Sequence, residues 1–154
     1  MSDPTLKERV AEDLREAMRA GQKVRLGALR LLSAAITMRE KEVLHELSDD
    51  EVREVAAKEV KKRNESIEAF EAAGRDELVQ KERDERAAIE GYAPEQLSDE
   101  EVDAAIAEAI AASGATSEQD LGKVMGAVMG KLKGRVDGNV VRSKVQSRLG
   151  SGSG

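Results

Sequence analysis

The chain of 154 residues contains no cysteine and no tryptophan, and it has one histidine, one tyrosine and one phenylalanine. Without cysteine it cannot form disulfides, use a catalytic thiolate or bind a metal through sulfur. Its only histidine, His45, has no second histidine or cysteine to complete a metal site. We therefore expect neither a metal nor a cofactor. Because aromatic residues are so scarce, the core must be aliphatic, which favours helices packed on helices over a β-sandwich.

Long apolar runs are also missing from the sequence. No stretch approaches the ~18 consecutive apolar residues that a membrane-spanning helix needs. The first residues do not follow the basic-then-apolar plan of a signal peptide. We therefore expect no association with a membrane and a cytoplasmic location.

Charge is abundant but unevenly distributed. The net charge is −6, with 31 acidic and 25 basic residues. Residues 46–119 hold nine Lys/Arg and 22 Asp/Glu, whereas residues 120–154 hold seven Lys/Arg and only two Asp/Glu. The chain is therefore acidic overall and ends in a segment of net charge +5.

The spacing of apolar residues predicts an all-α fold. Apolar side chains recur every three or four residues over four segments, approximately 5–20, 22–44, 48–74 and 76–90. The third segment opens with a capping box at Ser48 and Glu51, a pattern that pairs the side chain of each residue with the backbone amide of the other. The fourth segment is more polar, and we expect it to be frayed or partly exposed.

A domain boundary is expected near Pro94. Proline disfavours helical geometry in the residue before it, so the helical pattern should stop at Ala93. We predict a helical N-terminal domain over residues 1–92, a small C-terminal tail domain over residues 93–149, and a flexible Ser/Gly tail at residues 150–154.

The C-terminal domain is predicted to contain three helices. The first two open with further capping boxes, Ser98 with Glu101 and Thr116 with Gln119. The third follows a turn at residues 133–138 and continues to about residue 149.

Several familiar motifs do not lead to a site. His45 is better explained as an exposed helical residue than as part of a Ser-His-Asp triad, because no serine lies in an activated elbow. Residues 126–131 have three residues between their glycines, where a phosphate-binding loop needs four. The basic run Lys61-Lys62-Arg63 is better explained by pairing with neighbouring carboxylates than by ligand binding.

A stretch rich in glycine and lysine, residues 122–138, is the most distinctive part of the chain. Gly122, Gly126 and Gly130 recur every four residues and so form one ridge of a helix, with Gly134 in the turn beyond. Each glycine inside a helix costs up to ~1 kcal/mol relative to alanine, so three of them need a reason. One explanation, which we favour for Gly126, is close packing of another helix. The other is close approach of an extended anion such as a nucleic-acid backbone.

From about Leu6 to Leu149 the sequence resembles the GatB/YqeY family. The most specific matches are FEAAGR at residues 70–75, YAPEQLS at residues 92–98 and the glycine-lysine stretch. The resemblance implies a three-helix tail domain similar to that of the B subunit of tRNA-dependent amidotransferases, where it is a tRNA-contacting appendage. Ala93 and Val136 depart from the leucine and alanine that are common in relatives.

Three functions follow from this resemblance and from the charge pattern. The first is a tRNA-associated accessory protein in aminoacyl-tRNA amidation, which works with an aminoacyl-tRNA synthetase or an amidotransferase subunit. The second is an amidotransferase component, with the carbon–nitrogen ligase activity and glutamine as amido-N-donor that family labels give, although no catalytic residues are evident in this chain. The third is a scaffold whose acidic segment 46–119 binds a basic protein. For the first function, the residues expected to contact RNA are Lys123, Lys131, Lys133, Arg135, Arg142 and Lys144.

Overall fold

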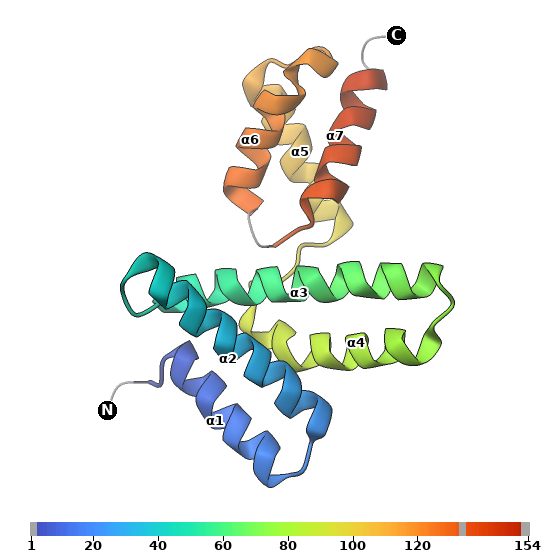
Figure 1. Cartoon of the computed structure of the whole chain (residues 1–154). Coiled ribbons are helices and arrows are strands. Elements are labelled where there is room, and N and C mark those ends of the chain that lie inside the picture. Colours follow the sequence, from blue (N-terminus) through green and yellow to red (C-terminus); the bar gives the residue numbers. More distant parts are fainter. Residues whose placement is uncertain (1–2, 133–134, 152–154) are drawn as a thin grey trace. The chain divides into compact units, whose positions relative to one another are not determined.

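The computed structural model describes residues 3–132 and 135–151. Within those ranges the chain forms seven α-helices, two short 3-10 helices and no strand, so the predicted all-α class is confirmed (Figure 1). The chain divides into two compact units, Met1–Pro94 and Glu95–Gly154, which we call unit 1 and unit 2. Independent folding of the two units stays a prediction. No helix in the described ranges is long and apolar enough to span a membrane.

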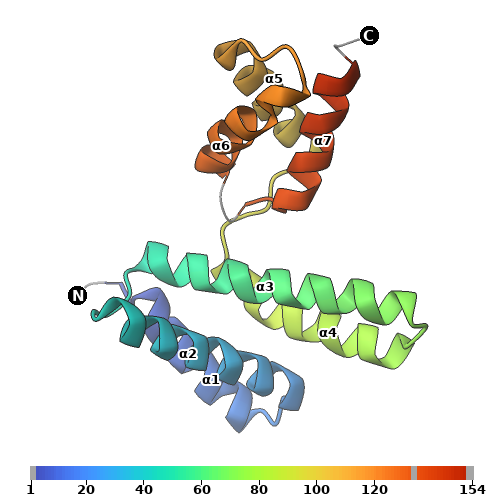
Figure 2. The same cartoon turned by 45° about the horizontal axis from the view of Figure 1, so that its top comes forward.

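Unit 1 consists of two antiparallel helical hairpins (Figures 1 and 2). The first pairs α1 (Leu6–Arg19) with α2 (Lys23–Val43), and the second pairs α3 (Asp49–Ala72) with α4 (Asp76–Ile89). The two hairpins pack together mainly because α2 lies on α3 and α4. A single 3-10 turn, η1 (Glu90–Tyr92), follows α4. The predicted helix limits agree with these bounds to within two residues.

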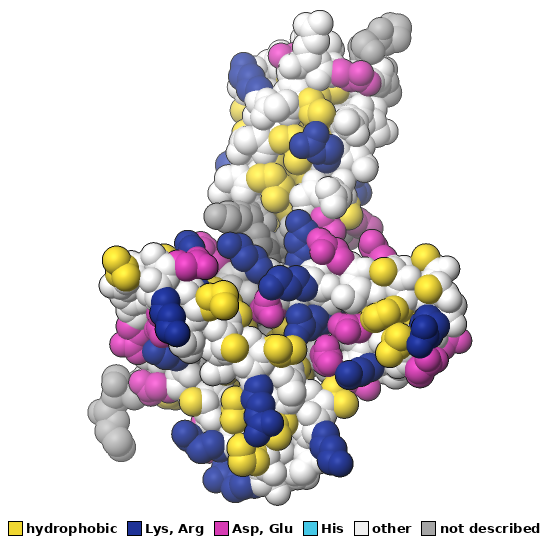
Figure 3. Space-filling model, in the orientation of Figure 1, with side chains coloured by type: hydrophobic (Ala, Val, Ile, Leu, Met, Phe, Trp, Pro, Cys, Tyr) yellow, Lys and Arg dark blue, Asp and Glu magenta, His cyan; other side chains and the backbone are white. Residues whose placement is uncertain are grey.

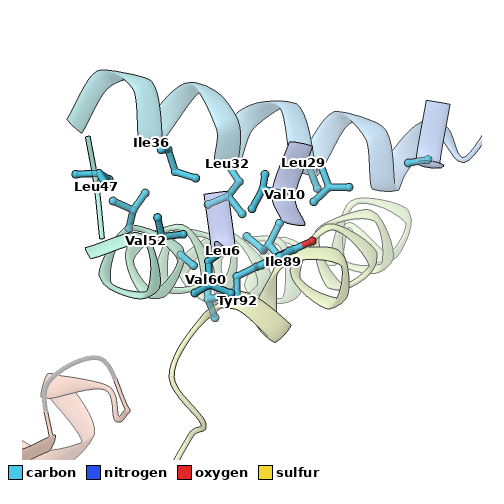
Figure 4. Close-up of a cluster of buried hydrophobic side chains, with 14 residues drawn as sticks. Leu6, Val10, Leu29, Leu32, Ile36, Leu47, Val52, Val60, Ile89 and Tyr92 are labelled. Carbon is cyan, nitrogen blue, oxygen red and sulfur yellow. The ribbon is translucent and has the colours of Figure 1, made fainter. Parts of the chain in front are cut away.

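The core of unit 1 is aliphatic, as the composition predicts, and Tyr92 is its one aromatic member (Figure 4). Leu29 and Leu32 from α2 and Ile89 from α4 are fully buried there. Val79 is also buried, so α4 is anchored near both ends and is continuous from Asp76 to Ile89. Of the two expectations for this helix, fraying is wrong and partial exposure is confirmed. Apart from Ala87, its exposed residues are polar, because only one side of α4 faces the neighbouring helices.

The ends of the helices in unit 1 follow local rules with one exception. Ser48 and Glu51 form the predicted capping box. Gly21 and Gly74 follow helices with φ of +68° and +67°, a conformation that glycine adopts without steric cost. Leu44 follows α2 with φ of +61° and is 88% exposed. A leucine is strained in this conformation, and its side chain gains no burial in return.

Unit 2 contains the three predicted helices, α5 (Asp99–Ser113), α6 (Leu121–Leu132) and α7 (Gly138–Ser151). A short 3-10 helix, η2 (Glu118–Asp120), leads directly into α6. The three helices enclose a small core of valine, leucine and isoleucine. Its buried members are Val102, Ile106, Val124, Val128, Leu132, Val141, Val145 and Leu149.

The caps in unit 2 differ from the sequence prediction. The Ser98 hydroxyl accepts a hydrogen bond from the Glu101 amide, which is half of the predicted capping box. The Glu101 carboxylate accepts from the Ser98 hydroxyl and not from the Ser98 amide, so the box is incomplete in the described structure. The predicted box at Thr116 is wrong, because the Thr116 amide donates to the carboxylate of Asp120 and the helix begins later.

The last helix has a cap that the sequence analysis did not identify. The carboxylate of Asp137 accepts from the Asn139 amide at 2.8 Å, which is the geometry of an N-cap. At its other end α7 continues through Ser151, so the helix includes the first two residues of the predicted flexible tail. The rest of that tail, residues 152–154, lies outside the described residues.

Candidate nucleic-acid interface

The glycine ridge of α6 faces open space. Gly122, Gly126 and Gly130 are all exposed, and a Cβ added at any of them would meet no atom within 4 Å. The buried row of α6 begins at Val124, about 200° around the helix from these glycines. The interpretation that another helix packs along the ridge is therefore wrong for the described residues. Gly134, the fourth predicted close-approach glycine, lies outside them.

Two lysines lie beside this ridge. Lys123 and Lys131 each follow a ridge glycine by one residue, about 100° around the helix. The Lys123 ammonium donates to the Ser113 carbonyl at 3.0 Å, at the negative end of the α5 dipole. Lys131 is 3.8 Å from Glu108, and both side chains are more than two-thirds exposed, so this pair contributes little. Both ammonium groups keep donors available for an anion.

Arg135 and Lys144 are occupied within the fold. The Arg135 guanidinium donates to the Glu95 carbonyl at 3.1 Å, while its own backbone carbonyl accepts from the Leu97 amide. Lys144 on α7 donates to Asp103 on α5 at 2.9 Å. That hydrogen bond raises the pKa of Lys144 and links two helices of unit 2. These two predicted RNA contacts therefore have structural partners that the sequence motif does not indicate.

The remaining predicted contacts are Arg142 and Lys133. Arg142 lies on the exposed face of α7 and makes no ion pair with any described residue. Lys133 lies outside the described residues. Among the described cations of the predicted set, Lys123, Lys131 and Arg142 are exposed and remain accessible to a ligand, whereas Arg135 and Lys144 are half-buried.

The charge of unit 2 is arranged by element. Residues 95–154 hold seven basic and nine acidic residues, a net charge of −2. The first turn of α5 carries Asp99, Glu100 and Glu101, whereas neither α6 nor α7 has an acidic residue in its first turn. A polyanion is therefore attracted by α6 and α7 and repelled by the start of α5 and by Glu118 and Asp120 of η2.

In unit 1 the two weaker candidates have structural explanations. His45 is exposed, as expected, but it lies in the loop that joins α2 to α3 and not in a helix, so that part of the prediction is wrong. Its Nε2 is 3.4 Å from a Glu51 oxygen. Within the basic run, Lys62 pairs with Glu59 at 2.9 Å. Arg63 is buried between Glu59 and Glu85, at 3.6 and 3.5 Å. The predicted pairing with carboxylates is therefore confirmed for Lys62 and Arg63.

Unit 1 also contains an open cleft of about 510 Å³. Arg9, Arg25 and Asp13 line it together with Tyr92, whose hydroxyl donates to Asp13. Burial, and then this hydrogen bond, raise the pKa of Tyr92 far above its usual range. The phenol therefore stays protonated at physiological pH and cannot act as a general base.

Titratable groups do not gather into a metal centre within the described ranges. No cluster of three or more histidine, aspartate or glutamate side chains there has the geometry to hold a metal ion.

Comparison with known proteins places the sequence in a family. A relative from Pyrenophora tritici-repentis, "Altered inheritance of mitochondria protein 41, mitochondrial", is 32% identical over 103 residues, which is 66% of this chain. The match covers 57% of that relative, a little over half of its length. A family described as "Yqey-like protein" matches residues 7–149, nearly the whole of both units. The chain therefore belongs to the YqeY-like family.

Proposed function

We propose that this protein is a cytoplasmic, tRNA-associated accessory protein that binds tRNA through unit 2 in the context of aminoacyl-tRNA amidation. The observation that carries the proposal is the exposed glycine ridge of α6, with Lys123 and Lys131 beside it. A ridge without side chains lets a phosphate backbone approach the helix, and flanking cations neutralise its charge.

The mode of recognition follows from the side chains in unit 2. The only aromatic residues of the chain, Phe70 and Tyr92, both belong to unit 1. Unit 2 therefore has no ring on which an unpaired base could stack. Recognition should depend on phosphates and on the shape of folded RNA, which suits a tRNA better than a single strand.

The test is tRNA binding by the full chain as a function of salt. If three or four cations contact phosphates, the logarithm of the affinity should fall with the logarithm of salt concentration with a slope of roughly −3 to −4. Reversal of Lys123, Lys131 and Arg142 to glutamate should abolish binding while the helical content measured by circular dichroism stays unchanged. Gly126→Leu should weaken binding without unfolding unit 2, because its side chain would extend into open space where the RNA backbone approaches.

A matched control separates local contact from total charge. Lys58, Lys61 and Lys81 in unit 1 are exposed and make no ion pair with the described residues. Their reversal to glutamate changes the net charge from −6 to −12, as does reversal of the three unit 2 cations. We expect the control to bind almost as well as the wild type. Equal loss in both variants, or no tRNA binding by the wild type at low salt, would rule out the proposed interface.

A further inference from the structure

The exposed face of α2 carries an unpartnered apolar row. Val24, Leu31 and Met38 are spaced seven residues apart, and their exposed fractions are 39%, 51% and 65%. Gly27 and Ala34 lie between them at alternating intervals of three and four residues, and both are exposed. A Cβ added at Gly27 would meet no atom within 4 Å, so this row also faces open space. Apolar and small residues at this spacing are the pattern of a helix that packs against another helix.

Three cations run parallel to the apolar row. Lys23, Arg30 and Lys41 fall within roughly 120° of it around the helix, on the same exposed side of α2. None of them makes an ion pair or a side-chain hydrogen bond with any described residue. Hydrophobic and basic side chains accordingly lie next to one another over α2 in Figure 3. These three positive charges lack carboxylate partners although the chain as a whole is acidic.

Leu44, just beyond the C-terminal end of α2, is a second and independent sign that this region serves more than folding. The helix ends at Gly21, Gly74 and Gly114 have glycine in the left-handed conformation, whereas the end of α2 has leucine. Its side chain is 88% exposed, and its conformation is strained. Stability alone would favour glycine here, so an exposed apolar side chain at this point indicates a contact outside unit 1.

We propose that the exposed face of α2 is a docking surface for an acidic amphipathic helix of a partner protein. The apolar side of that helix would cover Val24, Leu31 and Met38, while Gly27 and Ala34 allow the two backbones to approach closely. Its carboxylates would pair with Lys23, Arg30 and Lys41. The row spans about 21 Å, so the contact is small and should be reversible.

This chemistry favours a protein helix over RNA. A phosphate backbone would pair with the three cations but would leave the apolar row exposed to water. A basic partner, as expected for a scaffold that uses its acidic segment, would be repelled by the cations. Of these partners, only an acidic helix with an apolar side can both cover the apolar row of α2 and pair with its cations.

The experiment uses the full chain labelled with ¹⁵N and two synthetic helical peptides of about 21 residues, designed on a coiled-coil pattern. Both have leucine at the seam positions, and they differ only in flanking glutamate or lysine. The glutamate peptide should bind saturably and shift the amide signals of α2, at least tenfold more tightly than the lysine peptide. Leu31→Glu and Arg30→Glu should each weaken binding about tenfold or more.

Val140→Glu provides the matched control, because Val140 is an exposed apolar residue of α7 with a similar exposed fraction of 43%. It should bind the glutamate peptide as the wild type does. Equal binding of the two peptides, no binding of either, or shifts that leave α2 and Leu44 unaffected would overturn the proposal. It would also fail if tRNA shifted the α2 amides, or if light scattering showed a dimer of the chain that Leu31→Glu dissociates. Failure of tRNA binding in unit 2 would leave the proposal intact, since it rests on α2 alone.

Discussion

Replacement of Gly126 by alanine should stabilise unit 2. Gly126 lies in the middle of α6, and a Cβ at this position would meet nothing within 4 Å. The methyl group therefore brings no steric cost, and the full difference in helix propensity remains, about 1 kcal/mol in favour of alanine. Replacement of all three ridge glycines should add up to roughly 3 kcal/mol if the effects are independent.

The magnitude should be visible in thermal unfolding. For a unit of about 60 residues, 1 kcal/mol corresponds to a rise of roughly 4–8 °C in Tm. The aromatic residues provide a way to separate the two units, because Tyr92, the only tyrosine, lies in unit 1. Tyrosine fluorescence thus follows unit 1, while far-ultraviolet circular dichroism follows both. The transition seen by tyrosine fluorescence should be unchanged in Gly126→Ala.

The opposite sign would refute this reasoning. If Gly126→Ala lowers the Tm of unit 2, a neighbour must contact the ridge, and the packing explanation that the structure contradicts would be restored. Combined with tRNA binding, the same variant also reports function. A stabilised protein with weakened tRNA affinity would indicate that the three glycines are retained for a ligand at the expense of helix stability.

Two further predictions concern unit 1. Leu44→Gly should raise the free energy of unfolding by roughly 0.5–1 kcal/mol, because glycine removes the strain of a left-handed leucine but increases the entropy of the unfolded chain. Urea unfolding followed by tyrosine fluorescence measures this change. A loss of stability would show that the Leu44 side chain makes stabilising contacts. Burial, followed by the neighbouring Glu85, raises the pKa of Glu82, so the ionised carboxylate destabilises the fold as pH rises. Glu82→Gln should therefore be more stable than wild type at pH 7, with the advantage disappearing below about pH 4, and a pH-independent difference would contradict this assignment.

Much of the fold could be predicted from local signals. A cap such as Ser48 with Glu51 depends on residues three positions apart, so the sequence contains all the information about it. Helix limits could be predicted for the same reason. The cap at Thr116 failed because Asp120, one residue beyond the pattern, competes for the Thr116 amide and a 3-10 turn precedes α6. Local rules thus work until two local partners compete.

The candidate site was less predictable because burial is a tertiary property. Periodicity identifies a row of similar residues on a helix but does not say whether a neighbour covers that row. Gly126 was expected in a helix contact and is exposed. Arg63, in a basic run, is buried between two carboxylates. Lys144 matches a family motif, yet Asp103, 41 residues away, holds it within the fold.

Both proposals concern exposed cations, but exposure and the lack of an ion pair do not by themselves mark a site. Lys58, Lys61 and Lys81 of unit 1 are also exposed and make no ion pair with the described residues. The two proposed surfaces differ from those lysines, and from each other, in what lies beside their cations. In unit 2 the glycine ridge and its flanking lysines present backbone atoms and positive charge but little apolar surface, so the affinity for a polyanion there should fall steeply with added salt. On α2 the charges run beside Leu31 and Met38, whose burial does not weaken with salt. Salt dependence therefore distinguishes an interface that selects a polyanion from one that selects an amphipathic helix, even though both attract negative charge.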